Sequence, residues 1–339
     1  MKNSHNEIGS EFWSVPTSQK NGLFSYRNVS WHLSGRAALN AIIKEIKKER
    51  SAKTAALPSW CCDSMILPFL ENGISVSFYS VCYEDGRLCQ TVEQGEKADI
   101  VLVMDYFGYL SHNTVFTDGV VIRDLTHTVF SEEDPQGDFC FGSLRKWAGF
   151  YSGGFAFAKD GRSIPCYSDP RGEEIVQKRK EAMLEKAEYI SGKTESKDFL
   201  HGFSQAEELL DSCFDGAADP RDVHLIGQLD IPCIKEKRRK NAEFLLEHFR
   251  DLAVFKEIGE KDCPLFVPIL LDKKTRDGLK WHLIENRIYC PVHWPLTQHH
   301  GLTKKEAEIY EKEISLVCDQ RYTIEDMKRI VFSVKSYFK

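Results

Sequence analysis

The feature that most limits the fold of this chain is a series of short apolar runs separated by segments long enough for helices. The runs 100–104 and 119–122 are continuously apolar, which is typical of strands covered on both faces of a sheet. The segment 36–46 has apolar residues at helical spacing, and Ser34 is a suitable N-cap before it. This alternation predicts a mostly parallel sheet covered by helices. Some connections are shorter than a crossover needs, so we expect a mixed sheet.

The second half of the chain has a different character. Charged amphipathic patterns predict a helical segment over about 170–230, and a helix rich in lysine and arginine is expected over 234–250. Strand-like runs at 264–271 and 286–294 then alternate with helical patterns at 275–285 and 324–338. We therefore expect an α/β protein with a large domain, 1–235, and a smaller C-terminal α+β domain, 236–339.

Composition narrows the class of protein. The 339 residues carry a formal net charge of −6, which gives no electrostatic reason to expect a nucleic-acid partner. No apolar run approaches the roughly 18 residues that a membrane span needs, so no membrane partner is expected. The cysteine count is odd at 11, and no two cysteines have Cys-x-x-Cys spacing. We therefore expect reduced thiols, no metal site and a cytosolic location.

Lys146 is the first candidate for chemistry. It lies in the segment 138–147 and is followed by Gly153-Gly154, while an apolar run upstream ends at Asp124. Ligands bind at such strand ends in parallel sheets. A lysine amine that forms a Schiff base and a carboxylate that keeps a pyridinium nitrogen protonated are what a pyridoxal phosphate (PLP) site requires. The ordinary alternatives are a surface lysine and a carboxylate that caps a turn.

Further residues fit the same interpretation. Ser143 could donate to a phosphate from the turn that presents Lys146. Gly35 opens a helix, where free backbone N–H groups and the helix dipole favour an anion, and Arg36 could add a charge-assisted bond. Trp60 follows a predicted strand and could stack on a pyridine ring. A strand-end serine, an ordinary helix start and core packing are the respective alternatives.

Other candidates lie nearby or in the C-terminal part. His127 could orient Asp124 or contact the cofactor ring, although a hydrogen-bonded structural histidine is almost as good an explanation. His293, Trp294 and Arg321 are candidates for contacting the substrate. The fork geometry of Arg321 suits a carboxylate or a phosphate.

Taken together, these motifs resemble those of PLP-dependent sugar aminotransferases of fold type I, in the DegT/DnrJ/StrS family. The segments that carry the resemblance follow the family's order along most of the chain: 34–39, 57–60, 105–108, 124–127, 143–146 with 153–154, and 318–322. The resemblance implies Lys146 as the Schiff-base lysine, Asp124 as the pyridinium partner and Trp60 as the stacking aromatic. It places three residues around the phosphate: Gly35, Arg36 and Ser143. It also implies a homodimer with active sites at the interface.

The chain also departs from the family's pattern. Arg36, Arg123 and Thr126 stand where many members have threonine, glutamate and alanine. The Phe-His-x-x-Lys turn common in the family is replaced by the segment 142–146. These differences indicate a divergent branch.

We therefore expect a cytosolic, homodimeric PLP-dependent aminotransferase in which Lys146 holds the cofactor and then acts as general base and acid. It would move an amino group from an amino-acid donor to a keto acceptor, for which a nucleotide-linked keto sugar is one candidate. The alternatives are another PLP reaction, such as elimination or dehydration, and a regulatory or binding protein without catalysis. A nicotinamide dehydrogenase is disfavoured because the sequence has no Gly-x-Gly-x-x-Gly motif.

Overall fold

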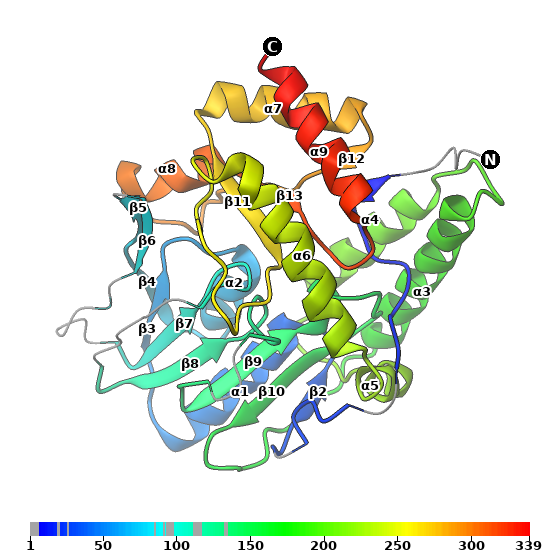
Figure 1. The fold of residues 1–339 in the computed structure, drawn as a ribbon. Helices are drawn as coiled ribbons and strands as arrows, with labels where there is room; N and C mark the ends of the chain where they lie inside the picture. The colour runs from blue at the N-terminus through cyan, green and yellow to red at the C-terminus, as the bar shows by residue number, and fades with distance from the viewer. Residues whose placement is uncertain are drawn as a thin grey trace.

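A seven-stranded sheet lies at the centre of the molecule (Figure 1). The computed structural model describes residues 7–18, 21–25, 27–84, 86–90, 92, 98–110, 117–131 and 135–339. In spatial order the strands are β2 (Ser30–His32), β10 (Gly154–Ala158), β9 (Phe139–Ser143), β8 (Val120–Asp124), β7 (Ile100–Met104), β3 (Thr54–Pro58) and β4 (Ser75–Tyr79). Strands β9, β8, β7, β3 and β4 are parallel, and β10 is antiparallel to both of its neighbours. The predicted mixed, mostly parallel sheet is confirmed.

Burial explains why the central strands are apolar throughout. Every residue of β7, β9 and β10 is buried. Helix α1 (Gly35–Glu49) packs against β2, β9 and β10, and α2 (Asp63–Glu71) packs against α1 and β4. The predicted cap of α1 is present, because the Ser34 side chain accepts a hydrogen bond from the Ala37 N–H.

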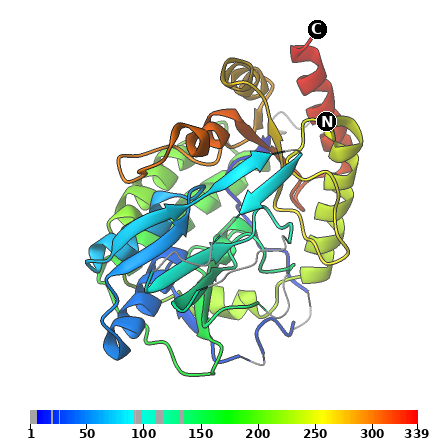
Figure 2. The same cartoon turned by 90° about the vertical axis from the view of Figure 1, so that its left-hand side faces the viewer.

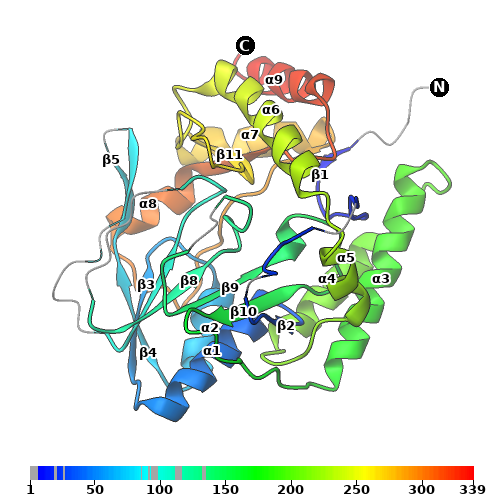
Figure 3. The same cartoon turned by 60° about the horizontal axis from the view of Figure 1, so that its bottom comes forward.

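Helices follow the sheet in the chain. The helices α3 (Arg171–Ile190) and α4 (Phe199–Asp211) form a packed pair beside the sheet, followed by α5 (Pro220–Ile226) (Figure 3). The hairpin of β5 (Val81–Glu84) and β6 (Arg87–Gln90) extends from the opposite side and lies next to α8 (Lys304–Lys312) (Figure 2). None of the helices in the described ranges is both long enough and apolar enough to cross a bilayer.

The C-terminal part builds its own apolar cluster above the sheet (Figure 1). It contains α6 (Ile231–Phe249), β11 (Phe266–Leu270), α7 (Lys273–Glu285), β12 (Ile288–Tyr289), β13 (Glu313–Val317) and α9 (Ile324–Tyr337). The two strands β11 and β13 are antiparallel. The predicted boundary near residue 235 falls inside α6 and stays a prediction.

One predicted strand is much shorter than the pattern indicated. The run 286–294 forms strand only at β12, which pairs in parallel with β1 (Ile8–Gly9). The pairing partner is therefore a two-residue strand from the other end of the chain. The rest of the run, including His293, turns toward the cavity described below.

Candidate active site

The ends of β8 and β9 meet the start of α1 at one edge of the sheet. Strand β9 ends at Ser143 and leads directly into a 3-10 turn, η1 (Leu144–Lys146). A Cβ atom on Gly35 would lie 3.4 Å from the Cβ of Ser143, and one on Gly154 would lie 2.1 Å from the carbonyl oxygen of Ser34. Glycine at 154 therefore lets β10 approach α1 closely, and the predicted neighbours Gly35 and Ser143 are together.

Asp124 is the last residue of β8 and is buried. Its Oδ1 accepts a hydrogen bond from the Thr126 N–H at 2.7 Å. The Thr126 side chain also interacts with this carboxyl. Burial raises the pKa of the Asp124 carboxyl to about 6. A buried carboxylate with no cationic partner among its causes of pKa shift suits a cation such as a protonated pyridine nitrogen.

His127 is buried among the rings of Phe107, His293 and Trp294. Its Nδ1 accepts from the Phe107 N–H at 3.2 Å, which leaves the proton on Nε2. Burial, followed by the charges of His293 and Lys146, lowers the pKa of His127 well below its usual value, so the ring is neutral. Trp294 stacks on it with ring centroids 5.8 Å apart. The structure thus brings His127 together with two candidates from the C-terminal part.

Trp60 does not have the position predicted for it. Its ring stacks on Tyr106 with centroids 4.8 Å apart, and its Nε1 donates to the carbonyl of His293 at 2.8 Å. A residue that stacks on a bound ring must present one face to the space where that ring lies. Trp60 is 0% exposed, so it is a core residue, and the stacking role is not supported.

Cys62 was missed by the sequence analysis. It is the N-cap residue of α2, is half-buried, and interacts electrostatically with both Lys146 and Asp124. Burial raises the pKa of its thiol. The signal was available, because Cys62 follows the end of β3 by four residues and so lies at the same edge of the sheet.

Arg36 also departs from its predicted role. Its guanidinium donates to the carbonyl of Leu210 at 2.7 Å and forms an ion pair with Asp211 at 2.8 Å. Both contacts lie at the end of α4, so Arg36 joins α1 to that helix. The assignment of Arg36 to a phosphate is therefore not supported by these contacts.

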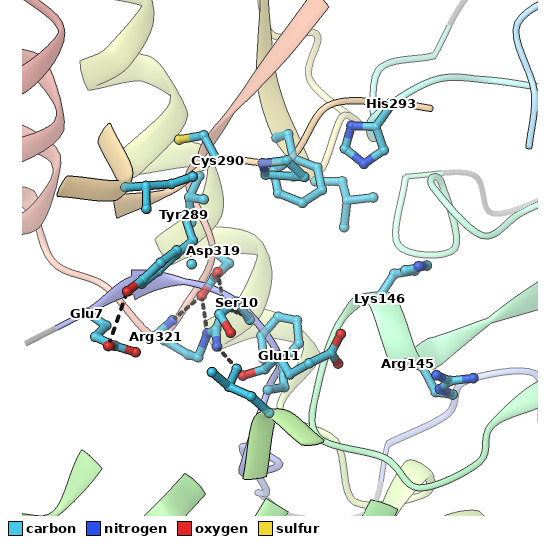
Figure 4. Close-up of a pocket in the computed structure, with 18 of the residues that line it drawn as sticks. Glu7, Ser10, Glu11, Arg145, Lys146, Tyr289, Cys290, His293, Asp319 and Arg321 are labelled. Carbon is cyan, nitrogen blue, oxygen red and sulfur yellow. Dashed lines mark hydrogen bonds and ion pairs between the residues drawn. The ribbon is translucent and has the colours of Figure 1, made fainter. Parts of the chain in front are cut away.

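Lys146 opens into a cavity of about 560 Å³ (Figure 4). The lysine is exposed and forms no hydrogen bond or ion pair with any other residue in the described part of the chain. Arg145 lies beside it, and Glu11 and His293 face it from the N-terminal segment and from the C-terminal part. A free amine at the wall of a cavity of this size can react with a bound small molecule.

The two other substrate candidates also line this cavity. His293 is held by its backbone N–H, which donates to Glu313 Oε2 at 2.7 Å, and by its Nδ1, which lies 3.0 Å from Ser315 Oγ. Arg321 instead binds Asp319 through two hydrogen bonds and donates to the carbonyls of residues 10 and 11. Its guanidinium fixes the N-terminal segment, and a direct substrate contact gains no support from these bonds.

Comparisons with solved structures identify proteins with a similar fold. No protein-family model matches the chain, and no curated protein matches its sequence. Among solved structures it is similar to PseC of Helicobacter pylori, an aminotransferase involved in pseudoaminic acid biosynthesis (TM-score 0.64, 15% identity, 97% of this chain and 99% of that chain covered). A DegT DnrJ EryC1 StrS aminotransferase from Brucella abortus gives a TM-score of 0.61 at 15% identity over 93% and 88%.

The putative sugar aminotransferase Spr1654 from Streptococcus pneumoniae, in its PLP form, gives a TM-score of 0.61 at 14% identity over 96% and 92%. At this level of identity the likeness concerns the fold. It extends over nearly the whole length of each chain. The chain therefore has the fold of these aminotransferases, PLP fold type I, as its motifs predicted.

Proposed function

We propose that this protein is a PLP-dependent aminotransferase that moves an amino group from an amino-acid donor to a keto acceptor. The observation that carries the proposal is the meeting of Lys146, the buried Asp124 and the Gly35–Ser143 contact at one edge of the sheet. This edge opens into a cavity of about 560 Å³. The fold is that of aminotransferases, one of which was solved with PLP.

The residues present fit the cofactor. The Asp124 carboxylate would accept a hydrogen bond from the protonated pyridine nitrogen and keep it protonated, and the N–H groups at the start of α1 with the Ser143 hydroxyl would donate to the phosphate. Bound PLP supplies an electron sink that stabilises the carbanion left when the substrate Cα loses its proton. Lys146 Nζ would take that proton and return it to the adjacent position.

For the acceptor we propose a keto sugar, which a nucleotide could carry. The similar structures include proteins described as sugar aminotransferases, and the cavity has the size of typical small-molecule sites. We also propose a cytosolic homodimer with active sites at the interface. The exposure of Lys146 in a single chain supports the interface, and the 11 cysteines without a disulfide support a reducing compartment.

The test uses a ¹⁵N-labelled amino donor and a panel of keto sugars, with Lys146→Ala and Lys146→Arg beside the unaltered protein. We expect ¹⁵N to enter the acceptor with the unaltered protein and not with either variant. Turnover by Lys146→Ala would contradict the role of this lysine. Release of a keto product and ammonia without labelled amine would indicate elimination instead.

A further inference from the structure

Arg145 is a cationic residue in the wall of the cavity that Lys146 lines. It directly precedes Lys146 in η1, both residues line the cavity, and both extend from the same turn (Figure 4). The Arg145 side chain is 13% exposed, and it forms an ion pair with Glu207 of α4. The Arg145 side chain is thus largely buried but still contributes to the wall of the cavity that Lys146 lines.

Glu207 is shared between two arginines. Arg179 of α3, which is 1% exposed, also pairs with it, and Glu11 approaches Arg179 at 3.6 Å. Burial acts to raise the pKa of Glu207, but Arg145 and Arg179 outweigh it and lower that pKa to about 2. Glu207 is therefore ionised at any ordinary pH.

The balance of charge and exposure favours an added anion. Arg145, Arg179 and Lys146 give three cations against the two carboxylates of Glu207 and Glu11. The side chains of Glu207 and Glu11 are 44% and 45% exposed, respectively. Those of Arg145 and Arg179 are only 13% and 1% exposed. A planar guanidinium binds carboxylates through two parallel hydrogen bonds. The acidic side chains are thus the parts of this cluster that can move aside.

We propose that Arg145 binds the α-carboxylate of the amino donor, and that Glu207 competes with this carboxylate for the same guanidinium. A carboxylate bound by Arg145 would occupy the same cavity as Lys146, as the α-carboxylate of a reacting amino acid must. The inference rests on the proposed function for the identity of the ligand. The location of the carboxylate site is inferred only from the Arg145–Glu207 ion pair and from the position of these two residues in the cavity wall.

The proposal predicts that substitutions of Arg145 and of Glu207 change the affinity for a carboxylate in opposite directions. The probe is butyrate, a carboxylate without a reactive amine, titrated into the PLP-loaded protein and followed by NMR, with butyramide as the neutral control. For Arg145→Gln we expect the dissociation constant of butyrate to rise about tenfold or more. For Glu207→Gln we expect it to fall, because the competing charge is gone. Lys280→Gln removes another cation that lines the cavity from α7, and we expect a smaller change there.

A purely structural ion pair would behave differently. Equal weakening of butyrate binding in both variants, or unchanged binding in Arg145→Gln, would overturn the proposal. If Glu207→Gln does not fold, as judged by circular dichroism, Glu207→Asp takes its place, and its shorter reach is also expected to strengthen binding. Binding of butyrate needs no turnover. A protein that binds it through Arg145 but never reacts with PLP at Lys146 would contradict the proposed function and leave this inference standing.

Discussion

At the scale of single residues, the burial of the Asp124 carboxyl in the candidate site lowers the stability of the folded protein at neutral pH. A carboxyl whose folded pKa is about 6 holds a proton that the unfolded chain releases near its ordinary pKa of roughly 4. The unfolded state therefore binds fewer protons between these values, and stability falls as pH rises through this window. Above it, the folded protein keeps a buried charge that only a cationic ligand would relieve.

Replacing Asp124 with Asn should therefore stabilise the cofactor-free protein at pH 7. We expect a gain of at most about 3 kcal/mol in the free energy of unfolding at pH 7, and no gain near pH 4. Urea unfolding at both pH values measures it, and Asp118→Asn, which removes an exposed carboxylate, is the control. A variant less stable than the parent at pH 7 would contradict a destabilising, desolvated carboxylate at this position.

Cys62 allows a test of where the cofactor lies. Because its thiol interacts with Lys146 and Asp124, a ligand bound between those residues should cover it. We expect PLP to slow alkylation of Cys62 by a maleimide while leaving the exposed Cys166 unaffected, as measured by mass spectrometry of peptides. Equal rates at Cys62 with and without PLP would place the cofactor elsewhere.

Single residues also show the limit of reading a sequence. Lys146, Asp124 and Ser143 could be predicted because each follows a strand, and strand ends share one edge of a parallel sheet. The positions of Trp60 and Arg36 could not, because their partners are distant in the chain. Tyr106 occupies the face of the indole, and Asp211 binds the guanidinium.

At the scale of elements, the N-terminal segment connects the parts of the molecule. Strand β1 pairs with β12, and the residues that follow it pass beside α3 and line the cavity (Figure 1). Lys186 of α3 is buried and donates to Ser10 Oγ at 3.1 Å and to the carbonyl of Glu11. Burial, with a smaller effect of Arg321, lowers the pKa of Lys186 to about 7.

This lysine predicts a measurable pH dependence. Between its folded pKa of about 7 and its ordinary value of roughly 10.4, the unfolded chain holds a proton that the folded one lacks, so stability rises with pH. Relative to Lys186→Met, we expect the parent to gain about 2 kcal/mol in free energy of unfolding from pH 7 to pH 9. Denaturant unfolding of both proteins measures this. If the difference in free energy of unfolding between the two proteins is the same at pH 7 and pH 9, the Lys186 ammonium is not desolvated.

The pairing of β1 with β12 explains why the strand predicted over 286–294 is only two residues long. The apolar run 286–294 predicted a strand, but strands form by pairing, and the partner here is two residues long. Residues of the run beyond that partner line the cavity. In contrast, α9 follows its predicted bounds within one residue, because its apolar face and its cap are local features.

At the scale of the whole molecule, three regions of the chain meet at one cavity. The sheet edge supplies Lys146, the N-terminal segment supplies Glu11, and the C-terminal part supplies His293 (Figure 4). The fold class was predictable from the alternation of strands and helices, and the solved structures confirm it. The contribution of the N-terminal segment to the cavity wall was not, since it depends on hydrogen bonds between residues about 175 or more positions apart.

The most direct test of the central claim is the absorbance spectrum of the purified protein with PLP, before and after borohydride, followed by peptide mapping. We predict a band near ~420 nm that borohydride removes, with the cofactor then fixed to Lys146 and to no other lysine. Lys146→Ala should show neither the band nor the modified peptide. Absence of the band in excess PLP, or attachment at another lysine, would contradict the assignment of this site.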